Sequence, residues 1–208
     1  MLKEKPAAMN STELKDFQKL ARSQAVTFST AGQFRNSSQL QQMRDWLPSI
    51  GKICFAEGFY KISVEDLGAG WRASRVPAGG GVVIDLGWHL VDMILNLLSD
   101  GSIPEVESAR ILQARPSQEY DCEDSAMAVL NFRNRKLAIG NGFVPCSISL
   151  TRLGPSKTSE LTIYGEYGSL QLNRNVVKLH TAGKFEDRSF GMVSGQRLVA
   201  DAKRANGG

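Results

Sequence analysis

The longest apolar stretch of this chain runs from Ile84 to Leu98 and is interrupted by polar residues at regular spacing. Four of them recur at i, i+4, i+7 and i+11: Asp85, His89, Asp92 and Asn96. A helix places residues with this spacing on one face. Because an unpaired buried carboxylate costs several kcal/mol, a polar stripe on a buried helix needs partners or a function. Three glycines directly ahead, at 79–81, let the backbone turn closely into this helix.

Two shorter helices are predicted ahead of this stretch, each beginning with the spacing of a capping box. Asn10 and Glu13 begin the first, which extends to about Ser23 and is followed by a short β-prone run. Ser38 and Gln41 begin the second, and the proline after its apolar face ends it. No strand is expected before the first helix, so half of an α/β repeat is missing.

Runs of β-type residues separated by turn signals dominate the rest of the chain. One run covers 53–64, and a long loop over 65–81 leads from it to the helix. The other runs follow Leu98 and cover 106–115, 126–132, 136–143, 147–152, 160–164, 169–172 and 176–180. Short sequential strands with tight turns predict an antiparallel meander. The expected fold class is α+β, a predominantly antiparallel sheet with helices packed on one face, preceded by a remnant helix–strand unit of an α/β domain.

The composition is typical of a globular protein, with 208 residues, 42% of them hydrophobic and 22% charged. The net charge of +4 is spread along the chain, which argues against nucleic-acid and membrane binding. Three widely spaced cysteines favour reduced structural thiols, and Cys122 is expected on an exposed acidic turn with its neighbours 121–124. No signal peptide is recognised and no segment is expected to be apolar over the length of a membrane span, so we expect a cytoplasmic protein.

Two interpretations of Asp85 and His89 remain open. In the first, the carboxylate accepts the imidazole N–H, and the two residues form a satisfied pair in the core. In the second, Asp85 orients His89 as a general acid and base that titrates near neutral pH. The glycine turn and the additional polar positions favour the second interpretation. No metal site is expected, because the pair lacks a third ligand at helical or hairpin spacing.

The segment Gly68–Ala73 matches the pattern G-x-G-x-x-G/A literally. The dinucleotide fingerprint requires a buried strand before the glycines, a helix after them and an acidic residue about 20 positions further on. Here an acidic pair precedes the glycines, and the chain continues into Pro77 and further glycines. We therefore do not expect this segment to bind a pyrophosphate.

With these elements placed, the sequence resembles the Gfo/Idh/MocA family of oxidoreductases over roughly residues 1–180. The matching segments are Glu4-Lys5-Pro6 for its E-K-P motif, Trp71-Arg72 for its G-W-R stretch, residues 79–92 for its G-G-G-x-x-x-D-x-G-x-H-x-x-D segment and residues 163–170 for its I-Y-G-x-x-G-S-L hairpin. In this family the peptide bond before the proline of E-K-P tends to be cis.

The resemblance implies a constellation of Lys, Asp and His at a nicotinamide. Lys5 would polarise or orient the substrate hydroxyl, His89 would exchange its proton, and Asp85 would bind the substrate or hold His89. The other implied contacts are Trp71, Arg72 and Asp92 with the substrate, and Glu4, Lys5 and Pro6 with the cofactor, NAD or NADP. A cofactor-free protein remains an alternative, because no segment has the dinucleotide fingerprint in its required context.

The resemblance also implies a division of the chain. Residues 1–30 are expected to be a remnant of the nucleotide-binding domain, residues 31–193 the substrate and oligomerisation domain, and residues 194–208 a frayed tail that begins as a short helix. Members of the family carry a whole Rossmann domain ahead of E-K-P, whereas this chain starts at that motif.

Three functions are compatible with these residues. The first is the substrate-binding and acid/base part of an NAD(P)-dependent oxidoreductase acting on a sugar- or polyol-like hydroxy/keto compound. The second is a truncated, cofactor-independent relative that catalyses isomerisation, dehydration or cyclisation by proton transfer and positioning. The third is a non-catalytic module that associates through its sheet. We expect a small-molecule substrate and a homo-oligomer formed through the sheet face.

Overall fold

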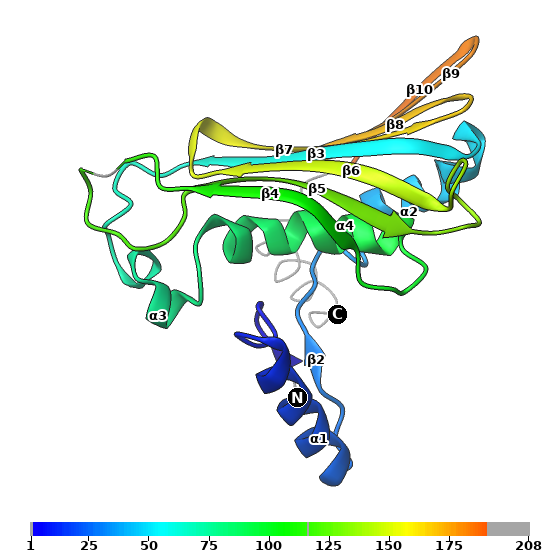
Figure 1. Ribbon diagram of the computed structural model, residues 1–208. Helices are drawn as coiled ribbons and strands as arrows, with labels where there is room; N and C mark the ends of the chain where they lie inside the picture. Colours follow the sequence, from blue (N-terminus) through cyan, green and yellow to red (C-terminus); the bar gives the residue numbers. More distant parts are fainter. Residues whose placement is uncertain (1, 116, 191–208) are drawn as a thin grey trace, which may run out of the picture.

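The computed structural model describes residues 2–115 and 117–190, which form a sheet layer, a helix layer and a smaller N-terminal unit (Figure 1). The sheet has eight strands. Helices α2 (Ser38–Trp46) and α4 (Trp88–Leu98) lie against one face of it, and no helix of the described residues covers the other face. The expected α+β fold, with a mostly antiparallel sheet and helices on one face, is confirmed.

The sheet is built around β3, the first of its strands in the chain. The strands are β3 (Ile53–Ser63), β4 (Glu105–Leu112), β5 (Ser125–Arg133), β6 (Phe143–Thr151), β7 (Leu153–Gly165), β8 (Gly168–Asn173), β9 (Val176–Thr181) and β10 (Lys184–Ser189). Their order across the sheet is β10-β9-β8-β7-β3-β6-β5-β4. β6 and β7 follow each other in the chain but pair with opposite edges of β3, and the β3–β6 pair is parallel. The expected simple meander is therefore interrupted at its centre.

Six of the seven runs predicted after Leu98 form strands, and the run at 136–143 does not. The side chain of Asn134 accepts hydrogen bonds from the N–H groups of Lys136 at 3.2 Å and Leu137 at 3.1 Å, which closes a turn there instead. The sequence pattern also missed β10. Four of its six residues are charged, so it lacks the apolar alternation that predicts a strand.

The N-terminal unit contains β1 (Leu2–Lys3), α1 (Ser11–Ser23) and β2 (Ser29–Thr30). The side chain of Asn10 accepts the N–H of Glu13 at 2.9 Å, so the predicted cap is confirmed. β1 pairs in parallel with β2, so the expectation that no strand precedes α1 is wrong. The β-prone run after α1 forms only the two residues of β2. The boundary placed after residue 30 stays a prediction.

α2 begins one position earlier than the capping-box spacing indicates. Ser37, instead of Ser38, is the cap, and its side chain accepts the N–H of Leu40 at 3.2 Å. Beyond α2 the chain continues through the 3₁₀ turn η1 (Leu47–Ile50). Pro48 lies in the first turn of η1, where its missing N–H leaves no hydrogen bond unmade.

The polar-striped helix is present and begins with a π-helical turn, η3 (Val83–Gly87), which continues directly into α4. The loop ahead of it contains the 3₁₀ turn η2 (Trp71–Ala73) and one helical turn, α3 (Arg75–Ala78). The fully buried side chains of Leu90 and Ile94 belong to the core between α4 and the sheet. The short helix predicted from residue 194 lies outside the described residues.

The expectation that no segment reaches the apolar length of a membrane span is wrong. The stretch Arg75–Leu98, which contains α3, the glycine turn, η3 and α4, has 24 residues and meets that criterion by length and composition. Its most apolar part is 56% buried inside the protein, and α4 contacts both β3 and β5. Burial against the sheet accounts for the apolar composition of this stretch, as in the core helix of a globular domain.

Candidate active site

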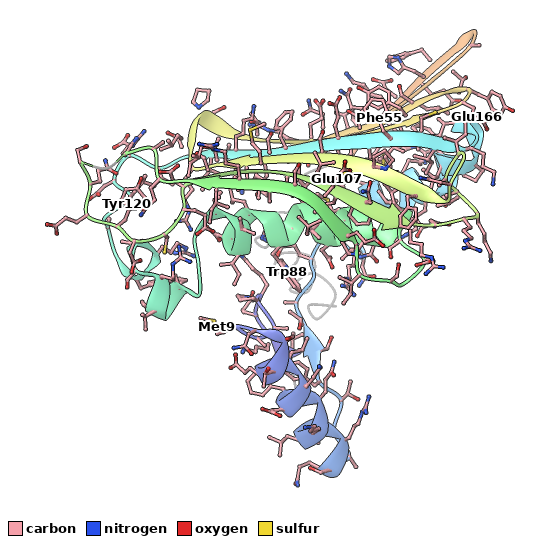
Figure 2. The ribbon with its side chains drawn as sticks, in the orientation of Figure 1. Met9, Phe55, Trp88, Glu107, Tyr120 and Glu166 are labelled. Carbon is pink, nitrogen blue, oxygen red and sulfur yellow. The ribbon has the colours of Figure 1, made fainter. Side chains whose placement is uncertain are left out.

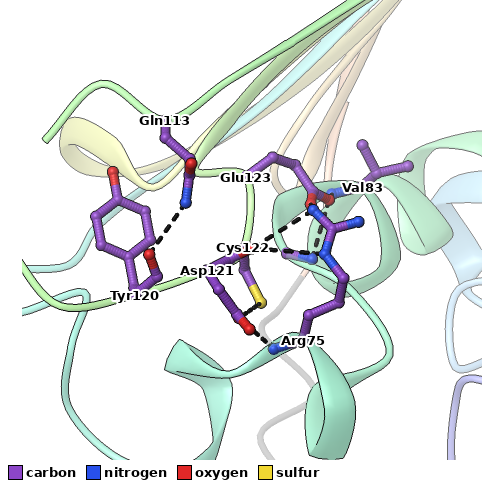
Figure 3. A network of polar contacts seen from close by, with 8 residues as sticks. Arg75, Val83, Gln113, Tyr120, Asp121, Cys122 and Glu123 are labelled. Atoms are coloured by element: carbon purple, nitrogen blue, oxygen red, sulfur yellow. Dashed lines mark hydrogen bonds and ion pairs between the residues drawn. The ribbon is translucent and has the colours of Figure 1, made fainter. Parts of the chain in front are cut away.

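The glycine turn ahead of η3 is held by Glu123, which precedes β5 (Figure 3). One carboxylate oxygen of Glu123 accepts hydrogen bonds from the N–H groups of Gly81 at 2.9 Å and Val83 at 3.2 Å. The N–H of Val82 donates to the carbonyl oxygen of Glu123 at 2.9 Å. A Cβ on Gly81 would overlap that carbonyl oxygen, so the close approach requires glycine. These contacts fix the start of η3 and the position of its polar side chains.

The exposed acidic turn expected around Cys122 is a buried one. Cys122 and Asp124 are 0% exposed, and Glu123 is 7% exposed. The carboxylate of Asp124 accepts hydrogen bonds from the Tyr120 hydroxyl at 2.5 Å and from the N–H of Ala114 at 2.6 Å. Buried carboxylates persist where hydrogen bonds satisfy them. The local sequence does not indicate this burial, because a run of acidic residues is typical of a solvated turn and the contacts of Glu123 with the glycine turn are about 40 positions away.

Asp85, in the π turn η3, lies at the centre of a cluster of cations. Lys5 Nζ donates hydrogen bonds to Asp85 Oδ1 and to the Asp85 carbonyl oxygen, both at 2.9 Å. Arg152 Nη2 donates to Asp85 Oδ2 at 3.2 Å, and Arg72 Nε lies 4.0 Å from the same oxygen. Burial opposes ionisation of Asp85, but the hydrogen bond from Lys5 and the three positive charges outweigh it and lower its pKa below 3.8. The carboxylate is therefore ionised.

His89, in the first turn of α4, lies next to two aromatic rings. Phe34 meets it edge-on, with ring centroids 5.4 Å apart, and the ring of Tyr60 lies at 6.2 Å. Burial, followed by the positive charge of Lys5, lowers the pKa of His89 below 6.5. Its imidazole is thus neutral at neutral pH. No hydrogen bond in the described part of the chain joins His89 to Asp85, because cations occupy the carboxylate instead. The interpretation as a core pair is therefore wrong, and so is the orientation of His89 by Asp85 in the second interpretation, whereas the acid/base role of His89 stays a prediction.

Asp85 and His89 line one pocket of about 360 Å³. Apolar side chains from β3 and the following loop form part of its wall, among them Ile62 and Leu67. Charged side chains form another part: Asp66, Arg72, Arg152 and Lys157. A pocket with apolar walls and a few convergent polar groups is typical of a small-molecule site.

The structure thus brings Lys5, Arg72, Asp85 and His89 together. Trp71 is placed differently. Its side chain is 56% exposed, lies outside the pocket lining and stacks against the guanidinium of Arg72, 4.3 Å from the ring centroid. A role of Trp71 in substrate binding stays a prediction.

Asp92 also lies outside the pocket lining. Its side chain is 6% exposed and accepts a bifurcated hydrogen bond from the single N–H of Arg35 Nε, at 2.9 and 3.1 Å, and a further one from Arg35 Nη2. This carboxylate is therefore engaged within the protein, and a contact with substrate stays a prediction. In the E-K-P segment Glu4 is exposed, and the peptide bond between Lys5 and Pro6 is cis, as the family resemblance implies.

The sequence reasoning did not select Arg152 or Lys157, which both line the pocket. One signal was present for Arg152, because it continues the alternating series of buried residues in β6, Val144, Cys146, Ile148 and Leu150. A charge on the buried face of a strand is rare without a partner or a function.

The residues that the structure describes do not fit the pyrophosphate of a dinucleotide. Gly68–Ala73 forms a loop and the turn η2, and the helix that follows, α3, has only four residues. A pyrophosphate site requires the N-terminus of a helix that follows a strand and a glycine-rich turn. Within residues 2–115 and 117–190, no group of three His, Cys, Asp or Glu side chains is placed to hold a metal ion.

The sequence and the fold are similar to those of known oxidoreductases, among them enzymes named for sugars. The 1,5-anhydro-D-fructose reductase of Ensifer adhaerens is 29% identical over 140 residues, which cover 66% of this chain and 41% of the reductase. Among solved structures, levoglucosan dehydrogenase in complex with NADH and levoglucosan aligns with a TM-score of 0.77 at 20% identity, over 91% of this chain and 54% of that one. An NAD binding oxidoreductase from Klebsiella pneumoniae aligns with a TM-score of 0.76 at 20% identity, over the same shares, 91% and 54%.

The chain therefore spans about half the length of each of these relatives. Residues 40–171 match the model of the GFO/IDH/MocA C-terminal domain, which is more than half of the chain. The matched segment includes β3, the glycine turn, η3, α4 and the strands β4 to β7, and it ends within β8. This protein therefore belongs to the Gfo/Idh/MocA family.

Proposed function

We propose that this chain supplies the substrate-binding and acid/base side chains of an oxidoreductase that acts on a sugar- or polyol-like hydroxy/keto compound. One observation carries the proposal: the Lys5 ammonium lies 2.9 Å from the carboxylate of Asp85, which lines the same pocket as His89. Relatives named for 1,5-anhydro-D-fructose and levoglucosan support a sugar-like compound.

His89 is the proton-transfer group in this proposal. A neutral imidazole accepts the proton of a substrate hydroxyl during oxidation and returns it during reduction of the ketone. The ionised Asp85 holds Lys5 at the pocket, where the ammonium orients the hydroxyl and stabilises negative charge that develops on its oxygen. Asp85 therefore positions Lys5, and no contact of Asp85 with His89 is needed.

The family relationship implies NAD or NADP, and the structural neighbours include complexes with NADH. A bound nicotinamide supplies the hydride chemistry. Glu4, Lys5 and Pro6 are the residues that the resemblance places beside it. Because the described residues do not fit the pyrophosphate, only binding and proton transfer are assigned to them here.

The test is to measure sugar binding by calorimetry and turnover by nicotinamide absorbance with the 208-residue chain. The ketone 1,5-anhydro-D-fructose is the probe in the reduction assay with NADH or NADPH, and levoglucosan, which has hydroxyls and no free carbonyl, is the probe in the oxidation assay with NAD or NADP. We expect the chain to bind a sugar and His89→Ala to abolish turnover while circular dichroism stays unchanged. His180→Ala is the matched control, because His180 is the other histidine of the chain and lies on β9, outside the pocket lining.

Micromolar binding of the cofactor together with turnover that depends on His89 would support the dehydrogenase proposal. Sugar binding without any effect of NADH or NADPH would favour the alternative of a cofactor-independent acid/base relative. Unchanged turnover in the His89→Ala variant, or the absence of any sugar binding, would contradict the proposal.

A further inference from the structure

Positive charge gathers around the pocket. Four cationic side chains line it or contact its lining: Lys5, Arg72, Arg152 and Lys157. Two carboxylates lie among them, Asp66 and Asp85. These cations come from four separate segments of the chain, so the fold, and not a local run of basic residues, collects the charge.

The two carboxylates do not compensate these four cations. Asp85 alone faces Lys5, Arg72 and Arg152, the farthest at 4.0 Å. Asp66 accepts the N–H of Gly68 at 2.8 Å and forms no ion pair in the described part of the chain. Within the same residues Lys157 has no ion pair either. The excess positive charge at the pocket is therefore available to a bound anion.

Arg152 is the pocket residue that most clearly has hydrogen-bond donors free for an acceptor on a ligand. Its side chain is 6% exposed, and its guanidinium donates one hydrogen bond among the described contacts, to Asp85 Oδ2. A guanidinium has five N–H donors, and the Arg152 nitrogens are not among the described buried atoms that lack a partner, so its free donors open onto the pocket that it lines. Because Arg152 lines the pocket, an acceptor on the bound compound would meet these donors.

We propose, on the basis of the function proposed above, that the substrate is a sugar acid whose carboxylate binds between Arg152 and Lys157. The planar fork of an arginine matches a carboxylate in geometry and charge, and the ammonium of Lys157 adds a second positive charge. The pocket volume of about 360 Å³ is at the lower end of the range for small-molecule sites, which suits a monosaccharide.

The same cations act on the proton-transfer group. After burial, the charges of Lys5 and Lys157 contribute to lowering the pKa of His89. A carboxylate bound beside Lys157 would offset part of this field. Binding of the acid would therefore raise the pKa of His89, and binding of a neutral sugar would lack this electrostatic contribution.

The test compares two ligands of the same shape, D-glucuronate and its neutral amide, D-glucuronamide, by calorimetry on the full 208-residue chain. We expect glucuronate to bind about tenfold more tightly, because hydrogen bonds between two charged partners are the stronger ones. Lys157→Gln is expected to reduce this preference severalfold. Lys178→Gln is the matched control, because Lys178 lies on β9 outside the pocket lining and its replacement leaves the preference unchanged. The NMR titration of His89 should move to higher pH with glucuronate only.

Equal binding of the two ligands would overturn the sugar-acid inference and leave the proposed function standing, because a neutral sugar would still occupy the pocket. The absence of binding by either ligand would overturn the inference, and the turnover assay described above then decides on the function separately. If Lys157→Gln weakened the binding of NADH and left the binding of glucuronate unchanged, these cations would belong to the site of a cofactor phosphate. This result would also overturn the sugar-acid inference.

Discussion

Lys5 joins the N-terminal unit to the pocket through its contact with Asp85. It reaches Asp85 across 80 positions of sequence, and its charge contributes to keeping His89 neutral. A lysine in this place therefore has two consequences: it orients a bound hydroxyl, and it tunes the base that takes the proton from that hydroxyl.

The electrostatic effect of Lys5 gives the first prediction. In Lys5→Gln the imidazole of His89 loses the positive charge that is the largest influence on its pKa after burial, so the pKa should rise toward 6.5. Titration of the His89 ring protons by NMR measures this shift. Lys3→Gln is the control, because Lys3 lies over the ring of Phe17 at 4.7 Å in the N-terminal unit. An equal His89 pKa in wild type and Lys5→Gln would contradict the prediction.

A second prediction concerns stability and pH. The folded protein lowers the pKa of His89, so below pH 6.5 the unfolded chain binds protons that the folded chain does not. The stabilisation due to the neutral His89 is present above pH 6.5 and is lost as the pH falls through the lower, folded pKa. Urea unfolding of wild type and His89→Phe over this range should show a steeper loss on acidification for wild type. Parallel pH profiles would show that His89 makes no such contribution.

Contacts between residues far apart in the chain could not be predicted from the sequence alone. The positions of Asp85 and His89 follow from helical spacing, but the contact of Asp85 with Lys5 was implied only by the family resemblance. Glu123 looked like part of a solvated acidic turn, because nothing local to it shows that it meets the glycine turn 40 residues earlier. Arg152 was detectable, since it continues the buried alternation of β6, yet its partner was not.

The glycine turn is the element that sets the position of η3 and α4. In Gly81→Ala the added Cβ would overlap the carbonyl oxygen of Glu123, so the turn or the buried acidic segment must shift. We expect a loss of about 2 kcal/mol in the free energy of unfolding, in the range of core overpacking, together with weaker sugar binding. Gly140→Ala is the control. It has a positive φ of 69° but no atom within 4 Å of an added Cβ, so it lacks the overlap and its sugar binding should be unchanged.

An ion pair between the half-exposed Arg35 and the buried Asp92 attaches the loop before α2 to α4. Arg35 donates to Asp92, whose side chain is 6% exposed, and the neighbouring Phe34 meets the ring of His89. Arg35→Met would leave the carboxylate of Asp92 unpaired, and because Arg35 itself is half exposed we expect a cost of about 2 kcal/mol in stability. Urea unfolding measures the loss. Arg44→Met, which removes only hydrogen bonds of 3.3 Å or longer, should cost far less. Adding Asp92→Asn to Arg35→Met should recover part of the loss.

On the scale of the whole molecule, the two faces of the sheet differ in kind. One face packs on α2 and α4 and contributes to the pocket, while the other carries partly exposed apolar side chains, among them Phe55 (Figure 2). The ring of Phe55 stacks on Tyr164 of the neighbouring strand, with centroids 4.4 Å apart. On the same face, Met127 of β5 is 65% exposed. Exposed apolar side chains that gather on one sheet face are typical of a surface that binds another protein.

We propose that this open face binds a second copy of the chain, as the family resemblance implies. Met127→Glu would place a charge on the surface and should shift the protein toward monomers in light scattering across a concentration series. Val76→Glu is the control, because Val76 is 85% exposed but lies on α3, away from the sheet face. Because η3 and α4, which line the pocket, lie against the opposite face of the sheet (Figure 1), the Met127→Glu monomer should still bind sugar. A wild-type monomer at every concentration, or an unchanged mass for Met127→Glu, would contradict association through this face.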